Sequence, residues 1–232
     1  MRKAYLIIIG LLVVFTLPVL GASSYLGGFS GVIITPDDTV VPAQTWEASF
    51  HDTLDLFDGS DSDLMTIGLT YGLLPNLEVG ASYIDDGSSQ IAISGKYRLM
   101  EEKSSAPSIT VGVFDIAGSV NSISNDPSFY VMFSKNITPL ASDIADRPSK
   151  PLRLGIGLGT GLYSGIIANL DWTLQPRLSL LAEYNSGSDG IGRLRHRPSA
   201  GIRWAASDSI RLDVAAVGFR DLGFGINYRS SY

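Results

Sequence analysis

Residues 65–83 read MTIGLTYGLLPNLEVGASY, and the fold follows from this stretch more than from any other. Apolar residues alternate with Thr, Gly, Glu and Ser on both sides of a short break at Pro75 and Asn76. A period of two is typical of β-strands with one buried face, and Pro followed by Asn is typical of a turn. The stretch therefore predicts two antiparallel strands joined by a hairpin.

The same alternation recurs along the chain, and no segment shows a helical period that competes with it. Further strands are expected at residues 46–50, 91–99, 109–113, 129–133, 152–158, 166–174, 178–184, 200–204, 210–216 and 222–228. The sequence thus predicts an all-β fold, an antiparallel barrel of about twelve strands over residues 46–232.

Alternation alone fits either a soluble β-sandwich or a transmembrane β-barrel. The apolar face carries no charge, and the polar face is mainly Gly, Ser and Thr, which favours the barrel. The chain ends in Tyr232 with aromatic and apolar residues at alternating positions before it, an ending typical of bacterial outer-membrane proteins. Aromatic residues at strand ends predict two interfacial girdles. One would hold Trp46, Tyr71, Tyr97, Phe133, Trp172, Trp204 and Tyr228, and the other Phe50, Tyr83, Phe129 and Tyr184.

Composition limits the function classes. The 232 residues include 17 Lys+Arg, 23 Asp+Glu and no Cys, which excludes a disulfide framework, a thiolate zinc site and a lipoprotein anchor. The acidic balance disfavours nucleic-acid binding.

Residues 1–22 combine Arg2 and Lys3 with an apolar run and small residues, which predicts a secretory signal peptide, with a membrane anchor as the alternative. We expect a protein of the bacterial outer membrane whose partners are membrane lipid and lipopolysaccharide.

Connection lengths predict an orientation. Short turns at 73–76, 175–176 and 206–208 are expected in the periplasm, and longer loops at 52–63, 116–127 and 185–197 outside. The segment 136–151 is long, contains three prolines and yet falls on the periplasmic side. It is either an ordered flap or contains a further strand.

Ten charged residues fall on the inward phase of the strands. They are Glu47, Glu78, Lys96, Arg98, Arg153, Asp171, Glu183, Arg203, Arg211 and Asp213. Five positive and five negative groups predict pairing across strands and a narrow or closed lumen with weak ion selectivity.

Residues 23–45 are too irregular for a strand but carry Phe29 and a Val-Ile-Ile run at 32–34. Small inward residues (Gly68, Gly80, Gly112, Gly155 and Gly157) would leave room for such a segment. A lumen plug is one interpretation, and a disordered periplasmic tail is the other.

No catalytic, cofactor or metal site is expected. His196 is followed by Arg-Pro-Ser rather than by the His-x-Ser pair of barrel phospholipases, and His51 is expected at a solvated strand end. An acidic loop could bind Ca²⁺ or Mg²⁺ through carboxylate oxygens but lacks the EF-hand spacing and a closing Glu, so a solvated outer loop is favoured; it comprises Asp52, Asp55, Asp58, Asp61 and Asp63. The glycines at 155–161 lack the spacing of a phosphate loop. Arg193, Arg195 and Arg197 could contact lipopolysaccharide phosphates, or be ordinary solvated charges.

Three stretches resemble YjbH-like barrels: Gly28-x-x-Gly31 with Thr35-Pro36, the segment 71–80 (YGLLPNLEVG), and the segment 178–184 (LSLLAEY). Proteins of this family are outer-membrane barrels associated with exopolysaccharide production, and typical members are much longer. The resemblance implies an outer-membrane barrel with polysaccharide or export partners. Together with the residue pattern it favours a structural or export-accessory barrel with a narrow or plugged lumen. The alternative is a small porin for small solutes or oligosaccharides, and a less favoured one is an enzyme at the lipid face.

Overall fold

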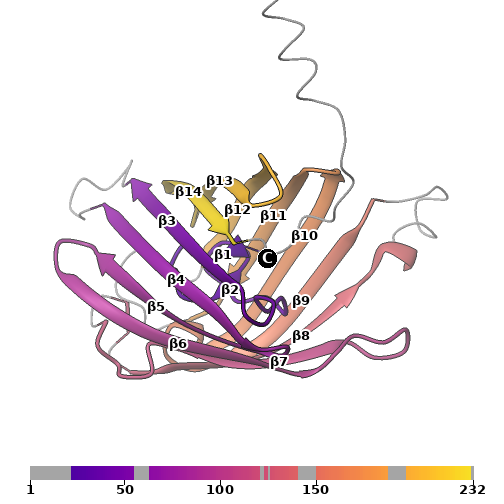
Figure 1. Ribbon diagram of the computed structural model, residues 1–232, viewed down its shortest axis with the longest axis horizontal. Helices are drawn as coiled ribbons and strands as arrows, with labels where there is room; N and C mark the ends of the chain where they lie inside the picture. Colours follow the sequence, from indigo (N-terminus) through magenta and orange to yellow (C-terminus); the bar gives the residue numbers. More distant parts are fainter. Residues whose placement is uncertain are drawn as a thin grey trace, which may run out of the picture.

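The computed structural model describes residues 22–54, 63–120, 123–124, 126–140, 150–187 and 197–230. Twelve strands of these residues form one closed antiparallel barrel (Figure 1), which confirms the predicted fold. The barrel strands are β3 (Trp46–Leu54), β4 (Leu64–Leu74), β5 (Leu77–Asp85), β6 (Ser89–Met100), β7 (Ser108–Phe114), β8 (Ser128–Asn136), β9 (Leu152–Gly159), β10 (Gly165–Gln175), β11 (Leu178–Asn185), β12 (Arg197–Ala205), β13 (Ile210–Val217) and β14 (Asp221–Arg229).

Each barrel strand pairs with its neighbours in sequence, and the last strand closes the ring on the first. The seam between β14 and β3 runs from Leu222 opposite Leu54 to Arg229 opposite Glu47. Closure satisfies the backbone groups of every strand, as lipid requires, because no water is available there to do so. Among the described residues, no helix is long and apolar enough to cross a membrane.

Successive side chains point alternately to lipid and to the lumen. On β4, Ile67 and Leu69 are 50% and 55% exposed, whereas Thr66 and Thr70 are fully buried. Trp46 lies opposite Tyr71 in the register, and its ring centroid lies 5.4 Å from that of Tyr228. Three neighbouring strands thus place aromatic rings at one level, as an interfacial girdle requires.

The two ends of the barrel carry different connections. The terminal end, where β3 begins and β14 ends, carries the connections 75–76, 101–107, 137–151, 176–177 and 206–209. The loop end carries the connections 55–63, 86–88, 115–127, 160–164, 186–196 and 218–220. The long connection 137–151 contains no strand in its described residues. The short turns expected in the periplasm therefore lie at the same end of the barrel as the first residue of β3 and the last residue of β14.

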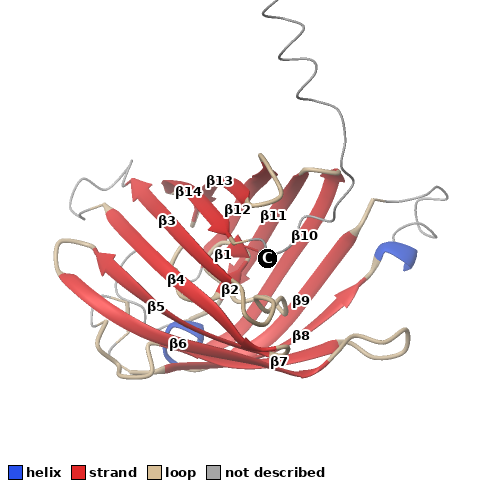
Figure 2. Ribbon diagram, in the orientation of Figure 1, coloured by secondary structure: helices blue, strands red, loops and turns tan. Residues whose placement is uncertain are grey.

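Residues 22–44, called the plug segment below, run inside the barrel. Two short strands, β1 (Ala22–Ser23) and β2 (Ser30–Gly31), pair with each other within the ring of barrel strands (Figures 1 and 2). Every residue from 22 to 36 is buried. The hydrophobic core of the molecule therefore lies in the lumen and includes this segment.

Candidate functional site

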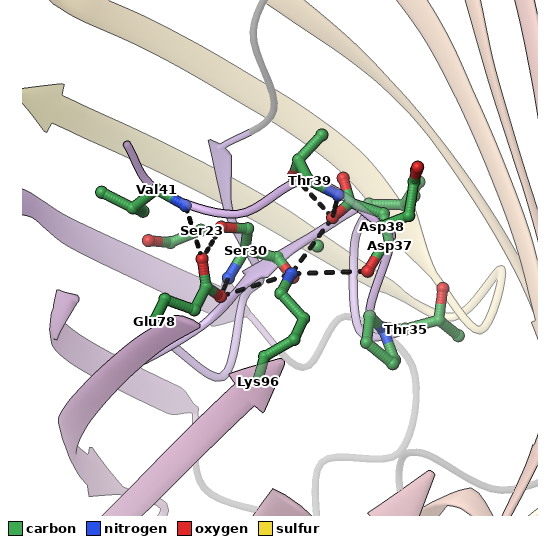
Figure 3. A network of polar contacts seen from close by, with 12 residues as sticks. Ser23, Ser30, Thr35, Asp37, Asp38, Thr39, Val41, Glu78 and Lys96 are labelled. Carbon is green, nitrogen blue, oxygen red and sulfur yellow. Dashed lines mark hydrogen bonds and ion pairs between the residues drawn. The ribbon is translucent and has the colours of Figure 1, made fainter. Parts of the chain in front are cut away.

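Glutamates of the barrel wall hold the plug segment by its backbone. Glu78 on β5 accepts hydrogen bonds from the Ser30 backbone N–H (2.7 Å), the Ser30 hydroxyl (2.7 Å) and the Val41 N–H (2.8 Å), as Figure 3 shows. Glu47 on β3 accepts from the Ser23 N–H (2.6 Å) and hydroxyl (2.8 Å) in the same way. Both strands of the β1–β2 hairpin are thereby fixed to the wall by carboxylates.

A third carboxylate binds the turn that follows the hairpin. Glu183 on β11 accepts from three consecutive backbone N–H groups, those of Ile33 (3.1 Å), Ile34 (2.9 Å) and Thr35 (2.9 Å). The Thr35 hydroxyl adds a fourth bond of 2.8 Å. Such converging amides form a concave site for an anion, and here the wall supplies the anion.

Cations of the wall bind the plug carbonyls. Lys96 on β6, opposite Glu78 in the register, donates to the Ser30 carbonyl (2.8 Å) and lies 3.3 Å from a Glu78 oxygen. Arg203 on β12 donates to the Val32 carbonyl (2.8 Å) and to Asp213 on β13 (2.9 Å). Carboxylates of the wall thus accept hydrogen bonds from N–H groups of the segment, and cations of the wall donate to its C=O groups, which is how buried backbone polar groups are satisfied.

An ion pair holds the plug segment near the terminal end. The Nε atom of Arg153 donates to Asp38 (2.7 Å), its terminal nitrogen contacts the second oxygen, and the Ser108 hydroxyl donates to the same carboxylate (2.5 Å). Burial alone would raise the pKa of Asp38, but the hydrogen bonds and charge of Arg153 outweigh it and lower this pKa below its usual range. The next anchor is Asn169, which donates to the Pro36 carbonyl (2.8 Å).

The loop half of the lumen is closed by apolar packing instead. Phe29 of the plug segment packs against Phe114 at the end of β7, with ring centroids 5.8 Å apart. The cluster around them combines plug residues, the inward-folded loop after β7 and the short 3-10 helix η1 (Gly161–Tyr163). It comprises Tyr25, Leu26, Phe29, Val32, Ile33, Ile34, Leu64, Ile84, Ala92, Phe114, Val120, Ile123, Tyr130, Met132, Leu162, Tyr163, Ile167, Leu181, Ala215 and Val217.

Two wall glycines let the plug backbone approach closely. A Cβ atom at Gly68 would lie 2.7 Å from the Cα of Gly27, and one at Gly80 would overlap the Gly28 carbonyl. Gly27 and Gly28 also have φ near +66° and +69°, where side chains are strained. The other small positions have different neighbours: Gly112 lies under the ring of Tyr130, Gly155 under Asn169 and Gly157 under Met132.

The ten charged side chains predicted for the lumen divide into two groups. Those fully inside the barrel are Glu47, Glu78, Lys96, Glu183, Arg203, Arg211 and Asp213. Those half-buried are Arg98, Arg153 and Asp171. Cross-strand pairing occurs between Arg203 and Asp213, which are bonded, whereas the Arg211 guanidinium lies 3.8 Å from a Glu47 oxygen.

Other functional residues were missed at the sequence level. Arg229 donates to Glu47 (2.8 Å) and falls in the inward phase of Asn227 and Gly225, so alternation could have identified it. Asp37 and Asp38 lie in a segment without periodicity, and no pattern marks them.

The expectation for His51 is wrong. Strand β3 continues to Leu54, beyond the predicted end at Phe50, so His51 occupies an inward position and is 1% exposed.

Asp52 and Asp63 flank the connection at the loop end. The other predicted residues of the acidic and basic loops, Asp55, Asp58, Asp61, Arg193, Arg195 and His196, lie outside the described residues, as does the side chain of Arg197. Within the described ranges, no cluster of three His or acidic side chains could hold a metal ion.

No protein-family model and no curated protein sequence matches the chain. Solved structures do match in fold. The KdgM porin superposes with a TM-score of 0.52 at 10% identity, over 80% of this chain and 99% of that chain. The Acinetobacter baumannii outer membrane protein Omp33 gives 0.46 at 11% identity, over 82% and 98% of the two chains. Outer membrane phospholipase A from Escherichia coli superposes with a TM-score of 0.41 at 11% identity, over 85% of this chain and 94% of that chain.

The protein is a bacterial outer-membrane β-barrel. The match to the KdgM porin covers nearly the whole of that barrel, and at this identity it concerns the fold. The closed ring and its apolar outer surface are what a lipid bilayer requires.

Proposed function

We propose that the protein is a small porin-class barrel whose lumen is kept closed by its own plug segment. The observation that carries the proposal is the occupation of the lumen by residues 22–41, whose backbone is held by Glu47, Glu78 and Glu183. Small hydrophilic solutes would cross only when this segment leaves its seat. The fold shared with the KdgM porin supports this assignment.

The chemistry of the inner wall favours a pore over a permanent core. Several buried wall hydroxyls have no hydrogen-bond partner in the described structure: Ser49, Thr66, Thr70, Ser82, Ser94 and Thr110. A permanently dry core normally satisfies such groups. A wall of hydroxyls and paired charges can instead be hydrated once the plug segment leaves, because water then replaces the plug backbone as partner.

Planar-bilayer recordings test this proposal. The full chain should show little conductance, and a variant lacking residues 22–41 should form stable open channels. Glu183→Gln should raise the open probability, because an amide cannot accept all four plug bonds. Glu101→Gln is the matched control, since that side chain is 71% exposed at the terminal end. A folded deletion variant that stays silent would overturn the porin assignment and favour a structural barrel.

We further propose that the protein is not an enzyme. A barrel phospholipase needs a nucleophile within reach of a base at the lipid face. His51 faces the lumen, and its two ring nitrogens and the Ser49 hydroxyl have no hydrogen-bond partner among the described residues. Incubation with phospholipid vesicles should release no fatty acid.

An accessory role in exopolysaccharide export is the second candidate. The residues that carry the YjbH-like resemblance at the start of the chain also build the plug segment: Gly28 touches the barrel wall, Thr35 binds Glu183, and the Pro36 carbonyl binds Asn169. Deleting the gene should then reduce secreted polysaccharide, with polysaccharide or export proteins as partners. Unchanged secretion would remove this candidate without affecting the porin proposal.

A further inference from the structure

His51 and Tyr25 form a fitted ring pair between the barrel and the plug segment. Their ring centroids lie 4.6 Å apart with planes tilted by 34°. Two glycines of β14 provide the seat: a Cβ at Gly225 would overlap the His51 ring, and one at Gly223 would overlap the Tyr25 ring. Tyr25 and His51 are each 1% exposed, so the plug segment shields the imidazole from water.

The pocket around His51 accepts a neutral imidazole better than a charged one. Neither ring nitrogen has a hydrogen-bond partner among the described residues. The nearest carboxylate oxygen, on Asp213 of β13, is 4.0 Å away and already accepts from Asn227 of β14 (3.0 Å) and Arg203 of β12 (3.3 Å). Arg203 adds a positive charge beside the ring.

The remaining elements around His51 offer it no free acid. The residue opposite it on β4 is the uncharged Thr66. Arg211 on β13 is a further cation, and Glu47, which lies on β3 with His51, is engaged by Arg229 and Ser23. A protonated ring at this place would therefore be a buried charge without a partner of its own, which is costly.

We propose that His51 is a proton-operated release for the plug segment: protonation of its imidazole at mildly acidic pH expels Tyr25 and β1 from their seat and opens the lumen. A histidine in water protonates near pH 6.5, and withdrawal of Tyr25 is what gives the ring access to water. The charged ring thus favours the open barrel, and the neutral ring favours the closed one. This inference rests on the proposed function only in taking the plug segment as the closure.

Plug release can be measured without any current. Val32→Cys places a reporter thiol at a 2% exposed plug position whose side chain makes no polar contact, in a chain that has no cysteine. A membrane-impermeant maleimide would label it in protein reconstituted into lipid vesicles. Ser88→Cys, in an exposed turn between β5 and β6, gives the reference rate that corrects for thiol ionisation.

From pH 7.5 to 5.0 the corrected labelling rate should rise by up to about thirtyfold, the factor set by a pKa near 6.5 that exists only in the open state. His51→Gln and His51→Asn should abolish this rise, while replacement of the other histidine, His196→Gln, should preserve it. Asp38 does not cause the rise, because its lowered pKa keeps it ionised at pH 5.

The outcomes separate this inference from the proposed function. A labelling rate independent of pH, in a barrel that conducts after plug deletion, would overturn the role of His51 alone; an ion pair between charged His51 and Asp213 would give this result. Acid-dependent labelling that His51→Gln abolishes, without conductance, would support the release and overturn the pore. A rise that persists in both folded His51 variants would also refute the role of His51.

Discussion

The two halves of the lumen close it by different physical means. Near the terminal end, the wall cations Lys96 and Arg153 fix the plug segment through hydrogen bonds of defined direction, to the Ser30 carbonyl and to the Asp38 carboxylate. Near the loop end, Phe29, Phe114 and their neighbours fill the space by apolar packing around the anchor that Glu183 provides. The directional contacts set where the segment lies, and the apolar contacts exclude water from what remains.

This difference predicts unequal tolerance to substitution. A buried charge whose partner is removed cannot find another, whereas an apolar side chain that becomes smaller loses only its own contacts and leaves a cavity. Single substitutions of charged residues in the terminal half should therefore cause large losses of stability, and those of apolar residues in the loop half smaller ones.

The largest effect is expected at Arg203. Arg203→Met should lower the free energy of unfolding by about 3–5 kcal/mol, because Asp213 is left as a buried unpaired charge. Urea titration of barrels refolded into lipid vesicles measures this, with Arg98→Met at the half-exposed barrel end as the control. The double variant Arg203→Met/Asp213→Leu should recover most of the loss. Equal effects of Arg203→Met and Arg98→Met would contradict the importance of burial.

The position next to Arg203 tests the outward face. Ile202→Arg should cost about 2–4 kcal/mol, because the charge enters lipid, and Val131→Arg on β8 should act likewise. Gly201→Ser is not the mild control that alternation suggests, since a Cβ there would lie 2.8 Å from the Val214 carbonyl. Ser94→Ala, which removes a buried hydroxyl without a partner, should be nearly neutral. A costly Ser94→Ala would mean that this hydroxyl has a role in the closed lumen.

A smaller effect is expected in the apolar half. Ile34→Val should cost about 0.5–1.5 kcal/mol and leave the lumen closed, because one methylene is lost while the backbone bonds to Glu183 remain. Channel recordings and urea titration check both expectations. An open probability as high as that of Glu183→Gln would show that packing, rather than the carboxylate, seats the segment.

The smallest effect is a pH dependence: the contribution of the Asp38 carboxylate is complete at neutral pH and is lost only in acid. Since the folded-state pKa of Asp38 is lowered, its ion pair contributes stability above the ordinary Asp pKa of about 4, and this contribution is lost as pH falls through the lowered value. Unfolding titrations should show that the free energy of unfolding of the natural chain exceeds that of Asp38→Asn at pH 7, and that this difference becomes smaller in stronger acid. A difference independent of pH would assign the stabilisation to shape instead of charge.

The strand number, the outward face of each strand and most lumen-facing charges could be predicted from the sequence. Alternation in β4 and β5 is a local property, because successive strand side chains must point to opposite faces. Arg203 and Asp213 could be placed on adjacent strands in advance, whereas their direct opposition is a matter of register that the structure supplies.

What only the tertiary structure decided concerns contacts between distant segments. Glu183 lies 148 residues from Thr35, and no local pattern relates a strand glutamate to the backbone amides of an irregular segment. His51 became an inward residue because pairing with β14 and β4 extends β3 beyond its alternating apolar core. The sequence by itself determined the barrel wall, since each strand carries its own pattern. The content of the lumen was decided by closure, because only a closed ring brings Glu47, Glu78 and Glu183 around one segment.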